Sequence, residues 1–269
     1  MSLLVRTWNL FHGNAVPPER RAFLESMVRL VTADRPDVLC LQEVPVWALR
    51  RLEGWSEMHV VGDVAARPSI GPIPSTAEMG RVLTELNHGV LRSTCTGQAN
   101  ALLLAPSLRV LAHEVLVLNP SRFRREQARW LGLDLVTRLV WAKERRICQA
   151  VRIALPDGGT ALVSNLHATS CTADQRLPDA ELRRAASFVD ALAHPDEPIL
   201  FCGDVNVRPS RSRTLAELQS WGFSEPRDGI DQVLVRGLPA TPAVAWPQER
   251  RRLDGRVLSD HAPVEAVVG

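Results

Sequence analysis

The chain has 269 residues, with a hydrophobic fraction of 45%, a charged fraction of 23% and a formal net charge of +2 at pH 7. This length is enough for one large α/β domain or two smaller ones, and the composition is ordinary for a globular protein. The net charge is too small to create a strong positive potential over the whole surface, so it does not by itself indicate a polyanionic partner. No stretch approaches the ~20 apolar residues that span a bilayer, and the N-terminus lacks the pattern of a signal peptide. We therefore expect a cytoplasmic protein without a membrane anchor.

Short apolar runs, bounded by Gly, Pro, Asp and Asn, alternate with amphipathic stretches along the whole chain. The predicted strands are residues 3–9, 37–42, 57–62, 99–105, 108–117, 146–155, 160–167, 198–203, 230–236 and 262–268. The predicted helices are residues 18–34, 45–52, 175–193 and 212–220. Pro156-Asp157-Gly158-Gly159 predicts an antiparallel hairpin turn. Ten strands are more than a single open sheet usually contains, so we expect two packed mixed sheets with flanking helices in a single domain, 1–269.

Three segments show neither the helical nor the strand period of apolar residues and are predicted to be long irregular loops: 63–80, 119–145 and 239–258. The second contains an arginine cluster with aromatic neighbours, and the third contains Arg250-Arg251-Arg252. Long loops over a rigid scaffold often carry substrate contacts, although a solvated surface explains such charges equally well.

The five cysteines include no CxxC pair, so neither a zinc site nor a full disulfide framework is indicated. Cys40, Cys148 and Cys202 lie in apolar strand-like runs and are interpreted as core residues. A Cys95–Cys171 bridge is an alternative that a reducing compartment disfavours.

Six polar clusters interrupt or end the apolar runs, and together they carry the functional signal. Asparagine, carboxylate and imidazole groups supply hard metal ligands, phosphate contacts and proton acceptors, which are the groups that phosphate-ester hydrolysis requires. Strand alternation puts Asn165 and His167 on one face, and it does the same for Asp204 and Asn206. The clusters are Thr7-Trp8-Asn9, Gln42-Glu43, Ser164-Asn165-Leu166-His167, Gly203-Asp204-Val205-Asn206, Ile230-Asp231 and Ser259-Asp260-His261.

In this order the clusters resemble the endonuclease/exonuclease/phosphatase superfamily, the family of DNase I. The resemblance implies a four-layered α/β sandwich with the site at one edge of two facing sheets. It also implies that Glu43, Asn9 and Asp260 hold Mg²⁺ or Mn²⁺, and that His261, oriented by Asp231, acts as general base.

The remaining site residues follow from the same resemblance. Asp204 and Asn206 would position the attacking water, and His167 would contact a phosphate oxygen. Asn100 and either Arg145 or Arg146 are further expected phosphate contacts. The chain departs from some family members, which have an acid two residues after the first asparagine; here Phe11 stands there, followed by His12. The chain also has no tyrosine.

The leading functional hypothesis is a DNase-I-like nuclease, with DNA as the substrate and a monomeric protein. Arg124 and Arg125, in the arginine cluster of segment 119–145, are the candidate DNA-backbone contacts. The alternative is a phosphodiesterase or phosphatase that acts on a lipid head group, an inositol phosphate or another small phosphate ester. A catalytically silent binding module is a third class, which the joint presence of the catalytic residue types disfavours.

Overall fold

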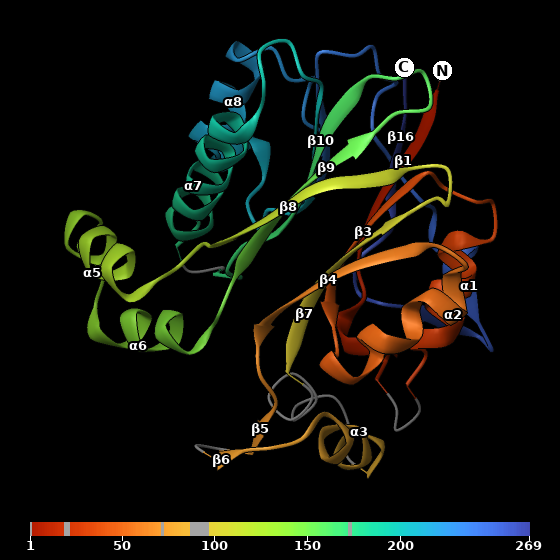
Figure 1. Cartoon of the computed structure of the whole chain (residues 1–269). Helices are drawn as coiled ribbons and strands as arrows, with labels where there is room; N and C mark the ends of the chain where they lie inside the picture. Colours follow the sequence, from red (N-terminus) through yellow and green to blue (C-terminus); the bar gives the residue numbers. More distant parts are fainter. Residues whose placement is uncertain (1, 19–21, 71–72, 87–96, 172–173) are drawn as a thin grey trace.

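The computed structural model describes residues 2–18, 22–70, 73–86, 97–171 and 174–269 (Figure 1). Two mixed sheets form its centre. The larger has the strand order β13 (Val244–Ala245), β16 (Val264–Val268), β1 (Leu3–Asn9), β3 (Val38–Val44), β7 (Gln98–Leu104), β4 (His59–Ala66). The second has the order β12 (Asp231–Arg236), β11 (Ile199–Asp204), β10 (Thr160–His167), β9 (Ile147–Ala154), β8 (Arg109–Val117). Two small sheets join β14 (Arg252–Leu253), β15 (Arg256–Leu258) and β2 (Ala15–Val16), and β5 (Ser69–Ile70) and β6 (Ile73–Pro74).

Alternation along the strands divides the core into three apolar layers. Val5, Cys40 and Cys202 belong to the layer in which the two sheets pack face to face. On the opposite face of the larger sheet, Leu39 and Leu41 pack under α1 (Leu24–Thr32) and α2 (Leu52–Ser56). On the outer face of the second sheet, Phe201 packs under α7 (Arg176–Leu192) and α8 (Arg213–Ser220). The predicted sandwich of helices, two facing sheets and helices is therefore confirmed.

Each sheet has one parallel strand pair at its centre. β1 pairs with β3 in parallel, and β10 pairs with β11 in parallel, whereas the flanking strands are antiparallel. The predicted hairpin is present, because β9 and β10 pair antiparallel. Gly158 adopts φ 92° in the turn between them. The two parallel pairs bring the ends of four strands to one edge of the sandwich.

A row of buried side-chain amides crosses the space between the sheets. Gln42 donates to Asn165 over 2.7 Å, and Asn165 donates to Gln149 over 2.9 Å. Gln149 donates in turn to Asp63 over 2.6 Å, which His113 contacts at 2.7 Å. Buried amides need partners, so this row fixes how the two sheets face each other.

Several predicted boundaries differ from the structure. Segment 119–145 is not an irregular loop, because it forms α5 (Ser121–Trp130) and α6 (Leu135–Lys143). Asp134 caps α6 by accepting a hydrogen bond from the Thr137 backbone. Four large apolar residues of α6 are exposed, which masks the one-sided period that identifies a surface helix; they are Leu135, Val136, Leu139 and Val140.

The other differences are smaller. The first α-helix begins at Leu24, not at residue 18. Residues 45–52 form the 3₁₀ helix η2 (Val46–Arg51), which leads into α2. The strand β4 extends into segment 63–80, which also contains β5, β6 and the start of α3 (Ala77–Leu86). Segment 239–258 contains β13, β14, β15 and the 3₁₀ helix η5 (Gln248–Arg251). Cys95 lies outside the described residues.

Candidate active site

The polar clusters predicted at strand ends meet at one edge of the sandwich. β1, β3, β10 and β11 end there, at Asn9, Val44, His167 and Asp204. Their antiparallel neighbours begin there: β7 at Gln98, β9 just after Arg146, β12 at Asp231 and β16 just after His261. In Figure 1 this edge lies opposite the marked chain ends. Polar groups from both sheets therefore converge on a single site.

Asp204 lies at the centre of this site and is 1% exposed. Its Oδ2 accepts a hydrogen bond from the Asn9 side-chain amide at 2.9 Å, and its Oδ1 accepts one from the Asn206 backbone at 3.0 Å. Gly203 adopts φ 137°, and a Cβ atom there would lie 2.0 Å from the Leu166 carbonyl oxygen. Only glycine allows the two strands to approach this closely beside the carboxylate.

Asn206 is placed differently from the prediction. β11 ends at Asp204, so strand alternation does not extend to Asn206, which has φ 51°. Its side-chain amide donates to the Ala168 carbonyl at 2.8 Å. Asn206 still lies beside Asp204, because its backbone N–H binds that carboxylate.

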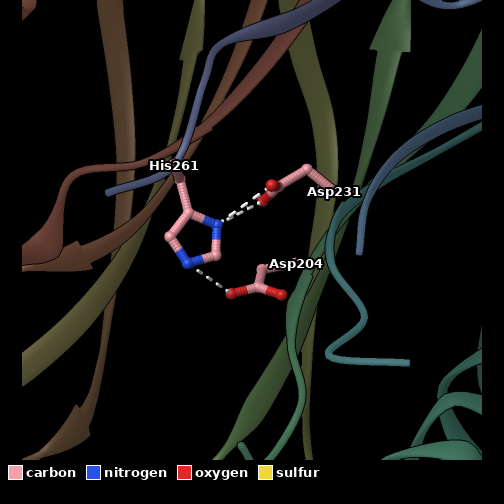
Figure 2. A group of neighbouring side chains, drawn as sticks. All are labelled: Asp204, Asp231 and His261. Atoms are coloured by element: carbon pink, nitrogen blue, oxygen red, sulfur yellow. Dashed lines mark hydrogen bonds and ion pairs between the residues drawn. The ribbon is translucent and has the colours of Figure 1, made fainter. Parts of the chain in front are cut away.

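His261 lies between two carboxylates, as Figure 2 shows. Its Nδ1 is 2.9 Å from Asp231 Oδ2, and its Nε2 is 3.8 Å from Asp204 Oδ2. Among the described His, Cys, Asp and Glu residues, Asp204, Asp231 and His261 form the group whose donor atoms all lie within 4.8 Å of one another. Asp231 is therefore the partner of the imidazole nitrogen Nδ1 in this structure.

The loop that carries His261 is held by several buried contacts. The Ser259 hydroxyl donates to the Asn9 carbonyl at 2.7 Å and accepts from the His261 backbone at 3.1 Å. Trp8 Nε1 donates to the His261 carbonyl at 2.9 Å, and Arg251 donates to the Ser259 carbonyl at 2.7 Å. These contacts fix the imidazole relative to the end of β1.

The charges of this cluster change the proton affinities of its members. Burial and the negative charges of Asp231 and Glu43 together raise the pKa of Asp204 to about 7, against the lowering effect of the His261 charge and the Asn9 hydrogen bond. Burial lowers the pKa of His261, but the nearby charges of Asp204, Asp231 and Asp260 and the Asp231 hydrogen bond outweigh it and raise this pKa to about 10. In the metal-free protein the imidazole is therefore charged at neutral pH.

His167 is the second imidazole of the site and is 1% exposed. Gln98 Nε2 lies 2.8 Å from its Nδ1, and one Arg146 guanidinium nitrogen lies 2.9 Å from Nδ1 and 3.0 Å from Nε2. The Gln98 amide donor at Nδ1 leaves the ring proton on Nε2, which faces Glu43 Oε1 at 3.7 Å and Asp204 Oδ2 at 3.6 Å. Burial and the Arg146 charge hold the pKa of His167 well below its usual value, so this ring is neutral.

Glu43 and Asp260 are two further carboxylates whose charges act on this cluster. Asp260 is about half exposed, at 47% of its side chain. Burial raises its pKa, the His261 charge opposes this, and the Glu43 charge raises it again. Carboxylates that repel one another in this way are oxygen donors that a hard divalent cation would satisfy, so the residues fit such an ion.

Asn9, the third predicted metal ligand, has other partners in this structure. Its Oδ1 accepts a hydrogen bond from the Phe11 backbone at 2.9 Å, and its amide nitrogen binds Asp204. Asn9 therefore lies in the site, where it holds Asp204 and the turn that follows β1.

The predicted substrate-binding residues divide into three groups. Arg146 is buried in the site, where it binds His167 and Glu144, and Arg145 beside it is exposed. Asn100 is 1% exposed between the sheets, with weak 3.4 Å contacts to backbone carbonyls. Arg124 and Arg125 are not in the catalytic cluster; they line a groove between α5 and α6 with Arg129 and Arg138.

Two site residues were not predicted from the sequence as functional: His12, whose Nε2 lies 3.2 Å from Glu43 Oε2, and Gln98, which fixes the His167 ring. Arg251 belongs to the arginine run that the sequence suggested for substrate contacts, and in the structure it supports the His261 loop. The sequence offers a signal for His12 alone, because it follows the position at which some family members carry an acid.

The comparison with known families agrees with this arrangement. The sequence model of the Endonuclease/Exonuclease/phosphatase family matches residues 7–261. The chain belongs to this family. Membership supports a metal-dependent phosphoesterase, and the match runs from Thr7, in the first polar cluster, to His261 in the last. No curated protein sequence matches the chain significantly.

Solved structures of this family share the fold at low sequence identity. A functionally unknown conserved protein from Enterococcus faecalis V583 is 16% identical with a TM-score of 0.67, and 99% of each chain is covered. A family protein from Bacteroides thetaiotaomicron is 15% identical with a TM-score of 0.65, covering 100% of this chain and 97% of that one. Truncated TDP2 from Caenorhabditis elegans is 16% identical with a TM-score of 0.62, with the same coverage.

Proposed function

We propose that this protein is a divalent-metal-dependent phosphodiesterase that hydrolyses phosphodiester bonds in DNA. The observation that carries the hydrolytic part is the Asp231–His261–Asp204 cluster, which lies beside Glu43 and Asp260. The cluster combines a proton acceptor, a positive charge and oxygen donors for Mg²⁺ or Mn²⁺ within one site. When bound, such an ion supplies a positive charge that neutralises the phosphate oxygens.

Within this site, Asp204 is the better proton acceptor at neutral pH. General bases work best when their pKa lies near the working pH, and the pKa of Asp204 is raised to about 7. We therefore assign removal of the proton from the attacking water to Asp204. This differs from the expectation from family resemblance, in which His261 is the base.

With Asp204 as the base, His261 acts as a hydrogen-bond donor and not as the proton acceptor. Asp231 holds its Nδ1, so its Nε2–H is available to a phosphate oxygen that enters beside Asp204. The neutral His167 ring presents Nε2–H toward the same region. Two N–H groups and a carboxylate thus surround the space in which an attacked phosphorus atom would be stabilised.

The case for DNA rests on arginine side chains beside the site and on the helices α5 and α6. Arg145 is exposed next to the buried Arg146. The groove between α5 and α6 is lined by Arg124, Arg125, Arg129 and Arg138. The chain continues from the end of α6 into Arg145 and Arg146. Arginine binds phosphate bidentately, so these residues suit a sugar–phosphate backbone. Arg250, which the sequence also suggested, instead pairs with Asp34 and Glu265.

A second candidate substrate is a phospholipid head group, and one observation favours it. The outer surface formed by α6 and the end of α5 exposes Trp130 at 77%, together with Leu135, Val136, Leu139 and Val140 at 53–70%. The inner side packs as a small core around Trp141 and Leu131, so the fold does not require the outer apolar surface. Apolar side chains beside arginines suit an anionic lipid surface. No helix among the described residues is long and apolar enough to cross a bilayer.

A paired substrate experiment tests the proposal. Purified protein with Mg²⁺ or Mn²⁺ is offered supercoiled plasmid and, separately, vesicles of anionic phospholipid, each with and without a chelator. We expect plasmid cleavage that the chelator abolishes and that Asp204→Asn and His261→Gln both lower by at least about 10²-fold. Asp228→Asn, at an exposed acid outside the cluster, is the control variant.

The outcomes separate the two substrates. Head-group release from vesicles without plasmid cleavage would replace DNA by phospholipid and retain the hydrolytic mechanism. Inertness toward both substrates and toward a bis-aryl phosphate ester would refute the phosphodiesterase itself.

A further inference from the structure

His12 lies in a turn that is built to hold it beside Glu43. The turn η1 (Phe11–Gly13) follows β1 directly, and His12 adopts the left-handed values φ 51° and ψ 22° within it. A left-handed conformation is uncommon for a residue with a side chain and persists only where its surroundings impose it. His12 is 6% exposed.

The surroundings impose this conformation from both sides. The Asn9 side chain accepts a hydrogen bond from the Phe11 backbone, and the Asn14 side chain donates to the Phe11 carbonyl at 2.8 Å. Gly13, with φ 82°, leaves no room for a Cβ atom, which would lie 2.5 Å from Leu24. The Ser259 backbone donates to the Asn14 carbonyl at 3.0 Å, so the turn also contacts the loop of His261.

Glu43 is bent toward this turn by its own backbone. It has φ 52°, and the pairing of β3 with β7 shifts register between Leu41 and Val44. As a result, Glu43 Oε2 lies 3.2 Å from His12 Nε2. Two residues in left-handed conformations, one in the turn after β1 and one in the neighbouring strand β3, thus bring an imidazole nitrogen and a carboxylate oxygen together at the edge of the site.

The distance between these two atoms is the one that neighbouring ligands of a single ion would have. Ligands at 2.0–2.1 Å in octahedral geometry are separated by about 3 Å when they are adjacent. We infer that His12 Nε2 is a nitrogen ligand of the divalent cation that Glu43 binds. This inference rests on the metal dependence in the proposed function, and the ring proton then resides on Nδ1.

A nitrogen ligand changes which cation the site prefers. Carboxylate and water oxygens suit Mg²⁺, whereas an imidazole ligand favours a transition-metal ion. The structure therefore assigns this site a preference for Mn²⁺ over Mg²⁺, and His12 is the residue that sets it.

Electron paramagnetic resonance of bound Mn²⁺ tests the ligand directly, without turnover. Pulsed measurements on the full chain with one equivalent of Mn²⁺ are expected to show coupling to a directly bound ¹⁴N nucleus. The coupling should disappear in His12→Gln and persist in His167→Gln and in His59→Gln, an exposed surface control. Circular dichroism shows whether each variant is folded.

Competition between the two metals provides a second measurement. The ratio of the Mg²⁺ and Mn²⁺ dissociation constants is expected to fall by at least about tenfold in His12→Asp, which restores an all-oxygen donor set. His12→Asp also keeps the test valid if His12→Gln does not fold.

Three results would overturn the inference. The first is bound Mn²⁺ without ¹⁴N coupling in the unmodified chain. The second is coupling that survives in His12→Gln and disappears in His167→Gln. The third is an unchanged metal preference in folded His12→Asp. Mn²⁺ binding with ¹⁴N coupling in a protein that cleaves no ester would refute the proposed hydrolysis and leave the His12 ligand intact.

Discussion

The side-chain amide of Asn9 donates a hydrogen bond to Asp204 Oδ2 over 2.9 Å and so joins the end of β1 to the end of β11. This bond lowers the pKa of Asp204 against the opposing effect of burial. In Asn9→Ala we expect the pKa of Asp204 to rise, so that the acidic limb of the pH–rate profile moves to higher pH. The measurement is kcat/KM from pH 5 to 9. A profile that does not move would show that Asp204 is not the base.

The metal-free protein is expected to lose stability as pH rises. The folded-state pKa values of Asp204 and His261 are raised to about 7 and about 10, so the native state binds both protons more tightly than the unfolded chain. The stability from Asp204 is complete below its unfolded pKa, near 3.8, and is lost as pH rises through about 7. The stability from His261 is complete below about 6.5 and is lost as pH rises through about 10.

Thermal unfolding with a chelator from pH 4 to 10 checks this expectation. In a plot of Tm against pH, Asp204→Asn should reduce the fall in Tm up to about pH 7. His261→Gln should reduce the fall in Tm up to about pH 10. A single maximum near pH 8 in the unmodified chain, unchanged in both variants, would contradict the assigned proton affinities.

Asp231→Asn is expected to keep the fold and lower kcat by about 10²–10⁴-fold. An amide at this position removes the charge that raises the pKa of His261 and that holds its Nδ1 proton. Circular dichroism and steady-state kinetics on plasmid provide the measurement. Asp228→Asn, at a site where the carboxylate is 89% exposed, should retain full activity.

Glu43→Gln is expected to remove most of the stabilisation that a bound cation supplies. A ligand at 100 times its dissociation constant stabilises the native state by about 2.7 kcal/mol, which appears as a rise in Tm. The neutral amide is a weaker ligand, so the rise with Mn²⁺ should largely disappear. An equal rise in Tm in the variant would place the cation elsewhere, for instance among Asp204, Asp231 and His261.

Asn165→Leu is expected to destabilise the fold by about 1–3 kcal/mol for each amide left without its partner. Asn165 bridges Gln42 and Gln149 between the sheets, and leucine has a similar size without hydrogen-bonding groups. Urea denaturation measures the cost. The triple change Gln42→Leu, Asn165→Leu, Gln149→Leu should cost less than three independent losses, because none of the three amides then leaves another one unpaired, and Asp63, which loses the Gln149 donor, keeps its contact with His113.

Arg124→Ala and Arg125→Ala test the DNA-binding groove. If the groove contacts the DNA backbone, each change should weaken binding similarly for all sequences and reduce the slope of log affinity against log salt by about 1. Fluorescence anisotropy with a labelled duplex at several salt concentrations gives both quantities. Unchanged affinity and slope would leave these arginines as part of a solvated or lipid-facing surface.

The sequence predicts the sandwich and much of the site because strand ends have a simple geometry. His167 and Asp204 were identifiable because each ends an apolar run and alternation assigns its side, and Asp231 begins such a run. Asn206 shows the limit of this reasoning, because the strand stops two residues before it.

The parts that the sequence did not predict depend on backbone conformations that have no local signature. His12 and Glu43 meet because each adopts a positive φ, and neither position carries the glycine that most often marks this conformation in a sequence. Gln98 becomes a site residue only through its distance to His167, which lies 69 residues away in the chain. The helices α5 and α6 were predicted as a loop because α6 is apolar on both its inner and outer sides.

The short connection from α6 to β9 links a surface to the reacting groups. α6 ends at Lys143, and Arg146, three residues later, donates to the His167 ring while Glu144 binds its guanidinium. The outer side of α6 is therefore separated from the side chain that holds the His167 imidazole by a chain segment of only three residues. A variant that shifts the C-terminal end of α6 would for this reason also change the position of Arg146 beside that imidazole.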